Sequence, residues 1–215
     1  MDKTEALRAL QQGAATLGVE LDNIAAEKLL RLRDELLRWN RKVNLTAISD
    51  PDDILDRHFL DSMAVLADVT GGCELLDLGS GAGFPGLPMK LVRPSIQLTL
   101  VDSSEKKAAF LKHAVAVLGL NHGVKVICAR ARGEPDREGI HRASVVVSRA
   151  VARLDKWVDL GRPYLRPGGK LLAMLSEGTS EDEIEETARS NQMSVATRTY
   201  RLPISGALRR ISTFQ

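Results

Sequence analysis

The 215-residue sequence predicts an α/β fold, in which a doubly wound and mostly parallel β-sheet follows a helical extension. From residue 70 onward, short apolar runs typical of buried strands alternate with longer segments of helical character. A glycine cluster over 75–86 follows the first of these runs, whereas before residue 70 apolar residues recur with a helical period. We therefore expect an N-terminal helical cap over 1–69 and a core over 70–215, joined as one continuous globular unit.

The composition is that of an ordinary globular protein. Hydrophobic residues make up 44% and charged residues 27% of the chain, which argues against disorder. The formal net charge is only +2, so a nucleic-acid surface would require local clustering of cations. Total charge therefore neither supports nor excludes an RNA partner.

Cysteine usage and the N-terminus indicate the compartment. Cys73 and Cys128 lie beside apolar strand-like runs, where we expect small core residues and not a disulfide or a metal pair. The first residues lack the apolar block of a signal peptide, and no sequence segment reaches the roughly 20 apolar residues of a membrane span. We expect a cytoplasmic monomer with no metal site and no membrane contact.

Two helices are predicted over residues 2–18 and about 22–43, and Asp22 is the predicted N-cap of the second. A third helix is expected to open at Ser49-Asp50-Pro51. It contains His58 and Asp61, which lie three residues apart on one helical face. A hydrogen bond between these two side chains would raise the pKa of His58.

The stretch that carries most information is Leu75 to Gly86, LLDLGSGAGFPG, an apolar strand that ends in a carboxylate and four glycines. Small residues there let a ligand approach the backbone, and a helix that begins nearby aims free N–H groups at it. The spacing Gly81-x-Gly83-x-x-Gly86 also fits the dinucleotide fingerprint, so a nicotinamide-dependent oxidoreductase is an alternative. Asp77 at the strand end and the prolines at 85 and 88, which suit only a first helical turn, argue against it.

Read as Asp77-x-Gly79-x-Gly81-x-Gly83, the stretch resembles the first motif of the S-adenosylmethionine (SAM) dependent methyltransferases. The resemblance implies a Rossmann-like class I sheet. It also implies that Asp77 lies near the methionyl end of the cofactor, and that the three glycines and Phe84 contact SAM through their backbone.

The second strand of the core, 96–102, ends in a carboxylate at Asp102. In a parallel sheet this carboxylate lies beside the glycine loop, where it can accept hydrogen bonds from both hydroxyls of a ribose. A plain N-cap aspartate is the alternative. We expect Asp102, followed by Ser103 and Ser104, to bind the ribose, with Ser104 capping the next helix.

The remaining core elements follow in alternation. Further strands are expected over 124–128, 143–148 and 170–175, with a turn at Pro167-Gly168-Gly169 and helices from 104 to 119, from 155 to 165 and from 181. A closing β-hairpin over 193–201 and 207–214 should expose four arginines: Arg198, Arg201, Arg209 and Arg210.

Several motifs together resemble the RsmG family, formerly glucose-inhibited division protein B, the bacterial guanine-N7 methyltransferases of small-subunit rRNA. In chain order they are Trp39-Asn40-x-x-x-Asn44-Leu45-Thr46, Arg57-His58-x-x-Asp61-Ser62, Gly81-x-Gly83-Phe84-Pro85-Gly86, Asp102-Ser103 and Ser148-Arg149-Ala150. Their order and the chain length match the family. The resemblance implies methyl transfer from SAM to N7 of a guanine in 16S rRNA, the family site being guanine 527, with the small ribosomal subunit as partner.

The resemblance also implies roles for individual residues. Ala131 and Arg132 would flank the adenine, although Arg132 replaces a family glutamate, so that a carboxylate contact there would require Glu134 as a substitute. The lysine that usually follows the fifth strand is missing from Leu175-Ser176-Glu177-Gly178. Arg149 would bind the cofactor carboxylate or an RNA phosphate, with an ordinary ion pair to an aspartate as the alternative. His58 and Arg149 are candidates for positioning the substrate.

The chemistry is constrained by motifs that the sequence lacks. An Asn/Asp-Pro-Pro-aromatic motif, which serves exocyclic nitrogens, is replaced by Ser-Arg-Ala, and neither cysteine follows the proline typical of a carbon-5 nucleophile. Guanine N7 needs no catalytic base because its lone pair carries no proton, so orientation against the methyl group is enough. A non-catalytic ribosome-binding module that kept this fold is a further alternative.

Overall fold

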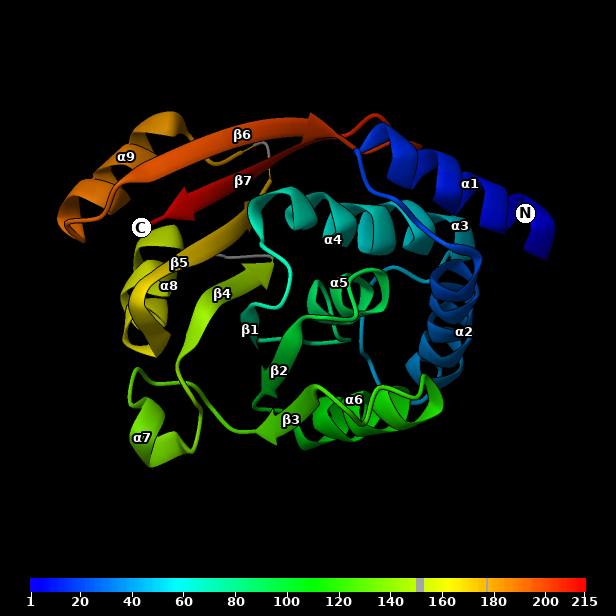
Figure 1. The fold of residues 1–215 in the computed structure, drawn as a ribbon, viewed down its shortest axis with the longest axis horizontal. Coiled ribbons are helices and arrows are strands. Elements are labelled where there is room, and N and C mark those ends of the chain that lie inside the picture. Colours follow the sequence, from blue (N-terminus) through cyan, green and yellow to red (C-terminus); the bar gives the residue numbers. More distant parts are fainter. Residues whose placement is uncertain (150–152, 177) are drawn as a thin grey trace.

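The computed structural model describes residues 1–149, 153–176 and 178–215. Its centre is a seven-stranded sheet with the order β3-β2-β1-β4-β5-β7-β6 (Figure 1). The strands span Glu74–Leu78 (β1), Gln97–Asp102 (β2), Val124–Cys128 (β3), Ala143–Arg149 (β4), Leu165–Leu175 (β5), Val195–Arg201 (β6) and Leu208–Phe214 (β7). Neighbouring strands from β3 to β5 are parallel, and β7 lies antiparallel between β5 and β6. The predicted α/β sheet is confirmed.

Helices cover both faces of this sheet (Figure 1). One face packs against α1 (Lys3–Thr16), α2 (Asn23–Asn40), α4 (Asp61–Ala64), α5 (Gly86–Val92) and α6 (Glu105–Val117). The other packs against α8 (Leu154–Gly161) and α9 (Glu181–Ser190), with α7 (Pro135–Glu138) near the end of β3. Leu75 and Leu76 belong to opposite clusters, because successive side chains of a strand point to opposite faces.

The N-terminal helices begin at side-chain caps, as the sequence predicts. Asp22 accepts a hydrogen bond from the backbone N–H of Ala25, and Asp50 caps α3 (Pro51–Ile54) in the same way. After α3 the chain continues as a π-helical segment (Leu55–Leu60), then α4, then a 3₁₀ turn (Val65–Asp68). A π-helical turn inside a helical run is rare and commonly marks a functional site.

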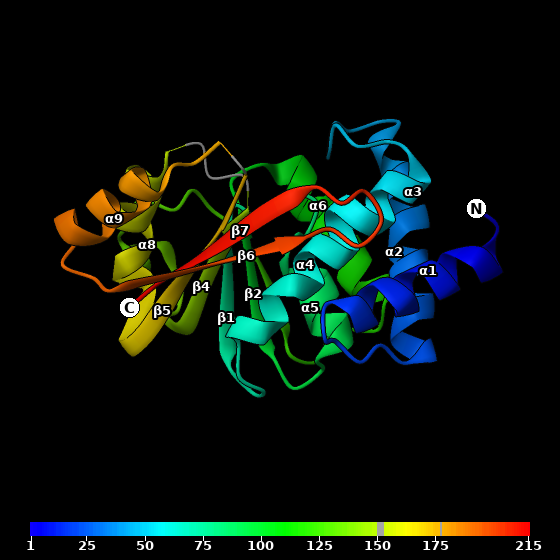
Figure 2. The same ribbon diagram turned by 90° about the horizontal axis from the view of Figure 1, so that it is seen from above.

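The C-terminal hairpin β6–β7 lies across α4 and is held there by acidic side chains (Figure 2). Asp56 accepts hydrogen bonds from the backbone N–H groups of Ile204 and Ser205 at the hairpin turn. Arg198 forms a two-pronged ion pair with Asp68. The prediction that all four hairpin arginines are exposed is therefore wrong: Arg198, Arg209 and Arg210 are partly buried, and only Arg201 is exposed.

Two further predictions need correction. Strand β5 begins at Leu165, five residues before the predicted start, and Pro167-Gly168-Gly169 forms a bulge within it, since the register against β4 shifts between Leu165 and Lys170. Cys128 is exposed, because the edge strand β3 is only partly covered, whereas Cys73 is buried as expected. Across the described part of the chain, no helix has the length and apolar character needed to span a membrane.

Candidate cofactor and substrate site

The candidate site lies at the carboxyl ends of the parallel strands, where β1 and β4 adjoin. The chain leaves β1 toward β2 on one side and β4 toward β5 on the other, so a crevice opens at this switch point. Two hollows lie there, of about 360 and 500 Å³. The smaller is lined by the ends of β1 and β2, by the loop after β3 and by α8, and the larger by the π-helical segment and the ends of β4 and β5.

The glycine loop after β1 divides into two functional parts. Gly79 and Gly81 adopt left-handed backbone angles (φ +76° and +57°), and a Cβ at either would meet open space or, at 3.9 Å, only the Gly79 carbonyl. Gly83 and Gly86 instead face the protein: a Cβ would lie 2.4 Å from a leucine side chain at Gly83 and 2.7 Å from one at Gly86. The first two glycines thus leave room for a ligand, and the other two allow α5 to pack on the sheet.

Phe84 does not present its backbone as the resemblance implied. Its N–H, like that of Gly83, donates to the carbonyl of Ser80 within the loop. The Phe84 ring is instead buried and stacks on His58, with ring centroids 4.3 Å apart. The residue therefore joins the loop to the N-terminal helices.

Asp77 lies beneath the loop and is almost fully buried. Its Oδ2 accepts a hydrogen bond from the Gly86 N–H (2.9 Å), whereas Oδ1 has no partner among the described residues. Burial raises the pKa of this carboxyl to about 7, against the lowering by that hydrogen bond and by the nearby Arg149 charge. An ammonium group brought to the unpartnered oxygen would satisfy it.

Asp102 holds the loop and the next helix together. Its Oδ2 accepts from the Gly81 N–H and its Oδ1 from the Ser104 N–H, both at 2.9 Å. Ser104 caps α6, as the sequence predicts, and Ser103 lines the smaller hollow with Asp102. Each carboxylate oxygen still has a second lone pair for a ribose hydroxyl.

The smaller hollow extends from Asp102 to the loop after β3. Ala131 lines it, as the resemblance implied, but Arg132 does not. The backbone N–H of Arg132 donates to Glu138, so Glu138 is the carboxylate at this loop, while Glu134 pairs with Arg137 on the surface. Trp157 and Leu160 of α8 complete the lining; neither belonged to a motif, so sequence reasoning gave no signal for them.

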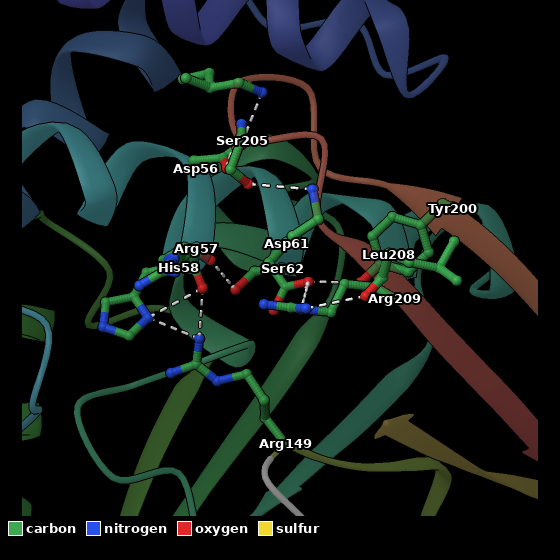
Figure 3. Close-up of polar contacts among 12 residues, drawn as sticks. Asp56, Arg57, His58, Asp61, Ser62, Arg149, Tyr200, Ser205, Leu208 and Arg209 are labelled. Carbon is green, nitrogen blue, oxygen red and sulfur yellow. Dashed lines mark hydrogen bonds and ion pairs between the residues drawn. The ribbon is translucent and has the colours of Figure 1, made fainter. Parts of the chain in front are cut away.

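The larger hollow is organised by a contact between Arg149 and His58 (Figure 3). Nη1 of Arg149, at the end of β4, lies 2.7 Å from Nδ1 of His58 and donates to the Arg57 carbonyl at 2.9 Å. Since a guanidinium can only donate, Nδ1 of His58 must accept, and Nε2–H is left to donate to Thr46 Oγ1 (2.9 Å). The Arg149 guanidinium also lies 5.1 Å from the centroid of the Phe84 ring.

The possible hydrogen bond between His58 and Asp61 is not formed. Asp61 instead accepts from the Tyr200 hydroxyl at 2.6 Å and lies near Arg209 (Figure 3). Burial, and then the charge of Arg149, lower the pKa of His58 to about 3. The side chain is therefore neutral at physiological pH, whereas a pairing with Asp61 would have raised its pKa.

Other residues of the N-terminal motif have structural roles. Asn40 accepts from the backbone N–H groups of Leu45 and Thr46, which shapes the loop that carries Thr46 to the hollow. Trp39 packs against Phe110 of α6. Ser148 is buried at the end of β4, whereas Ala150 of the Ser-Arg-Ala motif and Glu177 after β5 lie outside the described residues.

The comparison with protein families decides the classification. The family model for rRNA small subunit methyltransferase G, GidB, matches residues 25–209. The chain belongs to this family. It is 48% identical over 215 residues to the ribosomal RNA small subunit methyltransferase G of Myxococcus xanthus, covering 100% of this chain and 99% of the relative. The enzyme of the same name from Geobacter sulfurreducens is 40% identical over 96% of this chain and 95% of its own length.

Solved structures share the fold of this family member. A SAM-dependent methyltransferase from Aquifex aeolicus superposes with a TM-score of 0.57 at 16% identity, over 80% of this chain and 96% of that one. The tRNA methyltransferase TrmK of Bacillus subtilis superposes with a TM-score of 0.58 at 14% identity, over 72% of this chain and 64% of that one. The fold is that of the Rossmann-like class I methyltransferases, and family membership favours a methyltransferase over the nicotinamide-dependent oxidoreductase.

The cofactor is S-adenosylmethionine, and the residues present fit it. The glycine loop leaves open space at Gly79 and Gly81, and the unpartnered Asp77 oxygen suits the methionyl ammonium. Asp102 and the smaller hollow suit the adenosine. Among the described residues, no group of three or more acidic, histidine or cysteine side chains is arranged to hold a metal ion.

Proposed function

We propose that this protein transfers the methyl group of SAM to N7 of a guanine in 16S rRNA, at the family site, guanine 527. SAM, when bound, supplies an electrophilic methyl group on a sulfonium. In this assignment Gly79 and Gly81 receive the cofactor, Asp77 holds its methionyl ammonium, and Asp102 holds the ribose. The larger hollow receives the guanine.

The observation that carries the choice of N7 is the state of His58. Both of its ring nitrogens are occupied, one by Arg149 and one by Thr46, and its pKa of about 3 leaves it neutral. Asp61, the carboxylate lining the hollow, accepts the Tyr200 hydroxyl. The described lining therefore offers no free general base, and methylation of N7, whose nucleophilic lone pair carries no proton, needs none.

In this proposal His58 and Arg149 act by positioning the guanine. The His58 ring lines the larger hollow and is held in place by stacking on the buried Phe84 ring, so it can position an unstacked base there. Holding N7 in line with the methyl group and excluding water supplies several kcal/mol of barrier lowering, of the order of 7–11 kcal/mol for an ideally oriented pair.

The charge around the hollow supports an RNA acceptor. Three arginines line it, Arg57, Arg149 and Arg209, against one buried carboxylate. Arginine binds phosphate with paired hydrogen bonds, so this rim suits the phosphates that flank a base drawn out of its stack. The lining combines residues of the cap, 1–69, with residues of the core, which supports a cap that takes part in substrate binding.

The test is methylation of small ribosomal subunits taken from a strain that lacks the enzyme. The purified protein, supplied with tritiated SAM, should label 16S rRNA, and borohydride and aniline treatment should cleave the chain at the labelled guanine, as 7-methylguanine requires. Label without such cleavage would contradict N7, and an absence of label from both subunits and naked rRNA would favour the binding module.

Matched histidine variants sharpen this experiment. His58→Ala should lower the rate at least tenfold, since it removes a ring that lines the hollow and one partner of Arg149. His141→Ala removes an exposed histidine at the opposite edge of the sheet and should keep the wild-type rate. Equal rates for the two variants would contradict the role of His58.

A further inference from the structure

Two buried side-chain polar atoms in the described residues have no hydrogen-bond partner: Oδ1 of Asp77 and Nε1 of Trp157. Buried polar groups are almost always hydrogen-bonded, because burial removes the bond that water would make. Each of these atoms therefore calls for an explanation.

The two side chains lie on opposite faces of the sheet. Asp77 lies beneath the glycine loop on the α5 face, where its Oδ2 accepts from the Gly86 N–H. Trp157 lies on the α8 face and lines the smaller hollow together with Asp102 and Ala131. A ligand with a cationic end, a ribose and a hydrogen-bond acceptor at its other end would match this series of groups.

We infer that the indole N–H of Trp157 donates a hydrogen bond to a ring nitrogen of the SAM adenine. An indole nitrogen can only donate, and the ring nitrogens of adenine are acceptors, whereas the exocyclic amine is a donor. Trp157 therefore contacts adenine at one of its ring nitrogens and not at its exocyclic amine. Asp102 anchors the ribose next to it, so the base must lie in the hollow that Trp157 closes.

The surroundings of Trp157 make it a rigid donor. It lies near the start of α8, is 8% exposed, and belongs to the hydrophobic cluster on the α8 and α9 face of the sheet. Packing fixes the ring before the cofactor arrives, so little rotational freedom is lost on binding. The inference rests on the SAM cofactor alone and not on the proposed RNA acceptor, so the failure of either can be recognised separately.

The test is calorimetry with S-adenosylhomocysteine, the demethylated cofactor, on the full chain. Trp157→Phe keeps an aromatic ring but removes the donor, and should weaken binding about two- to tenfold, the worth of one neutral hydrogen bond. Trp39→Phe is the matched control: Trp39 packs against Phe110 of α6 in the other cluster, and its loss should leave the affinity unchanged.

Deaza analogues identify the hydrogen bond itself. In 1-deaza-, 3-deaza- and 7-deaza-adenosylhomocysteine, one ring nitrogen is replaced by C–H. One of these analogues should bind the unsubstituted protein more weakly than the parent compound does, by the factor that Trp157→Phe loses for the parent compound. The Trp157→Phe variant should bind that analogue and the parent compound equally. Equal loss for all analogues, or parent binding by Trp157→Phe within twofold of the unsubstituted protein, would overturn the inference.

Fluorescence supplies a readout that does not depend on the stability of the Trp157 variant. The chain has two tryptophans, so Trp39→Phe leaves Trp157 as the single indole emitter. Adding S-adenosylhomocysteine to that variant should change the intensity and wavelength of the emission. Saturating binding with no change in emission would place the adenine away from Trp157 and refute the assignment.

Discussion

Replacing Asp77 with asparagine removes a negative charge from beneath the glycine loop and keeps the shape of the side chain. The carbonyl of the amide can still accept from the Gly86 N–H. What changes is the titration: the folded protein holds this carboxyl at a pKa of about 7, against an ordinary value of 3.8. Because the pKa is raised, the folded state binds the proton more tightly, and this contribution to stability is lost as pH rises toward and through 7.

The magnitude follows from the two pKa values. At pH 5.5 the proton on Asp77 stabilises the folded state by about 2 kcal/mol, and at pH 8 by almost nothing. Asp61 also has a raised pKa, because it is buried, and contributes with the same sign. The difference between the unsubstituted protein and Asp77→Asn isolates the Asp77 part.

Cofactor binding should show the reverse dependence. The methionyl ammonium is best held by an ionised Asp77, so the affinity for S-adenosylhomocysteine should rise about 30-fold between pH 5.5 and pH 8. Asp77→Asn should bind more weakly at pH 8 and show a flat profile. Chemical denaturation without cofactor and calorimetry with it, at both pH values, measure the two effects.

The control is Asp182→Asn, an exposed aspartate in the first turn of α9. It should follow the unsubstituted protein in both assays. The reasoning about Asp77 fails if Asp77→Asn and the unsubstituted protein lose the same stability between pH 5.5 and pH 8, or if their binding profiles run parallel.

Three further predictions use the same structure. The rate of methyl transfer should show no inflection from His58 near pH 6.5, since its pKa is about 3, and a His58→Gln variant should keep the shape of the pH–rate profile between pH 6 and 8. Gly79→Ala should fold, at a cost of about 1–2 kcal/mol in stability for the left-handed backbone, yet lose cofactor affinity. Gly86→Ala should instead lower the melting temperature strongly, because its Cβ would lie 2.7 Å from a side chain of β2. Arg198→Ala breaks a partly buried ion pair and should cost about 1–3 kcal/mol in denaturation, whereas the exposed Arg201→Ala should cost less than about 0.5 kcal/mol.

The order of elements could be predicted from the sequence because it depends on local patterns. Apolar runs of strand length, the caps Asp22 and Ser104, and the glycine loop after β1 each act over a few residues, and the structure has them where they were expected. The placement of Asp102 beside the loop also followed, since the carboxyl ends of adjacent parallel strands meet at one edge. The family could also be predicted from the sequence, because each of its motifs spans only a few residues.

Only the tertiary structure decided the contacts between distant segments and the burial that follows from them. Arg149 reaches His58 across 91 residues, and burial together with that contact lowers the pKa of His58. Trp157 comes to the smaller hollow from a helix with no motif, and Arg198 pairs with an aspartate 130 residues away. No spacing in the sequence encodes these distances, because the desolvation of a charge and the partner that compensates it exist only once the chain has packed.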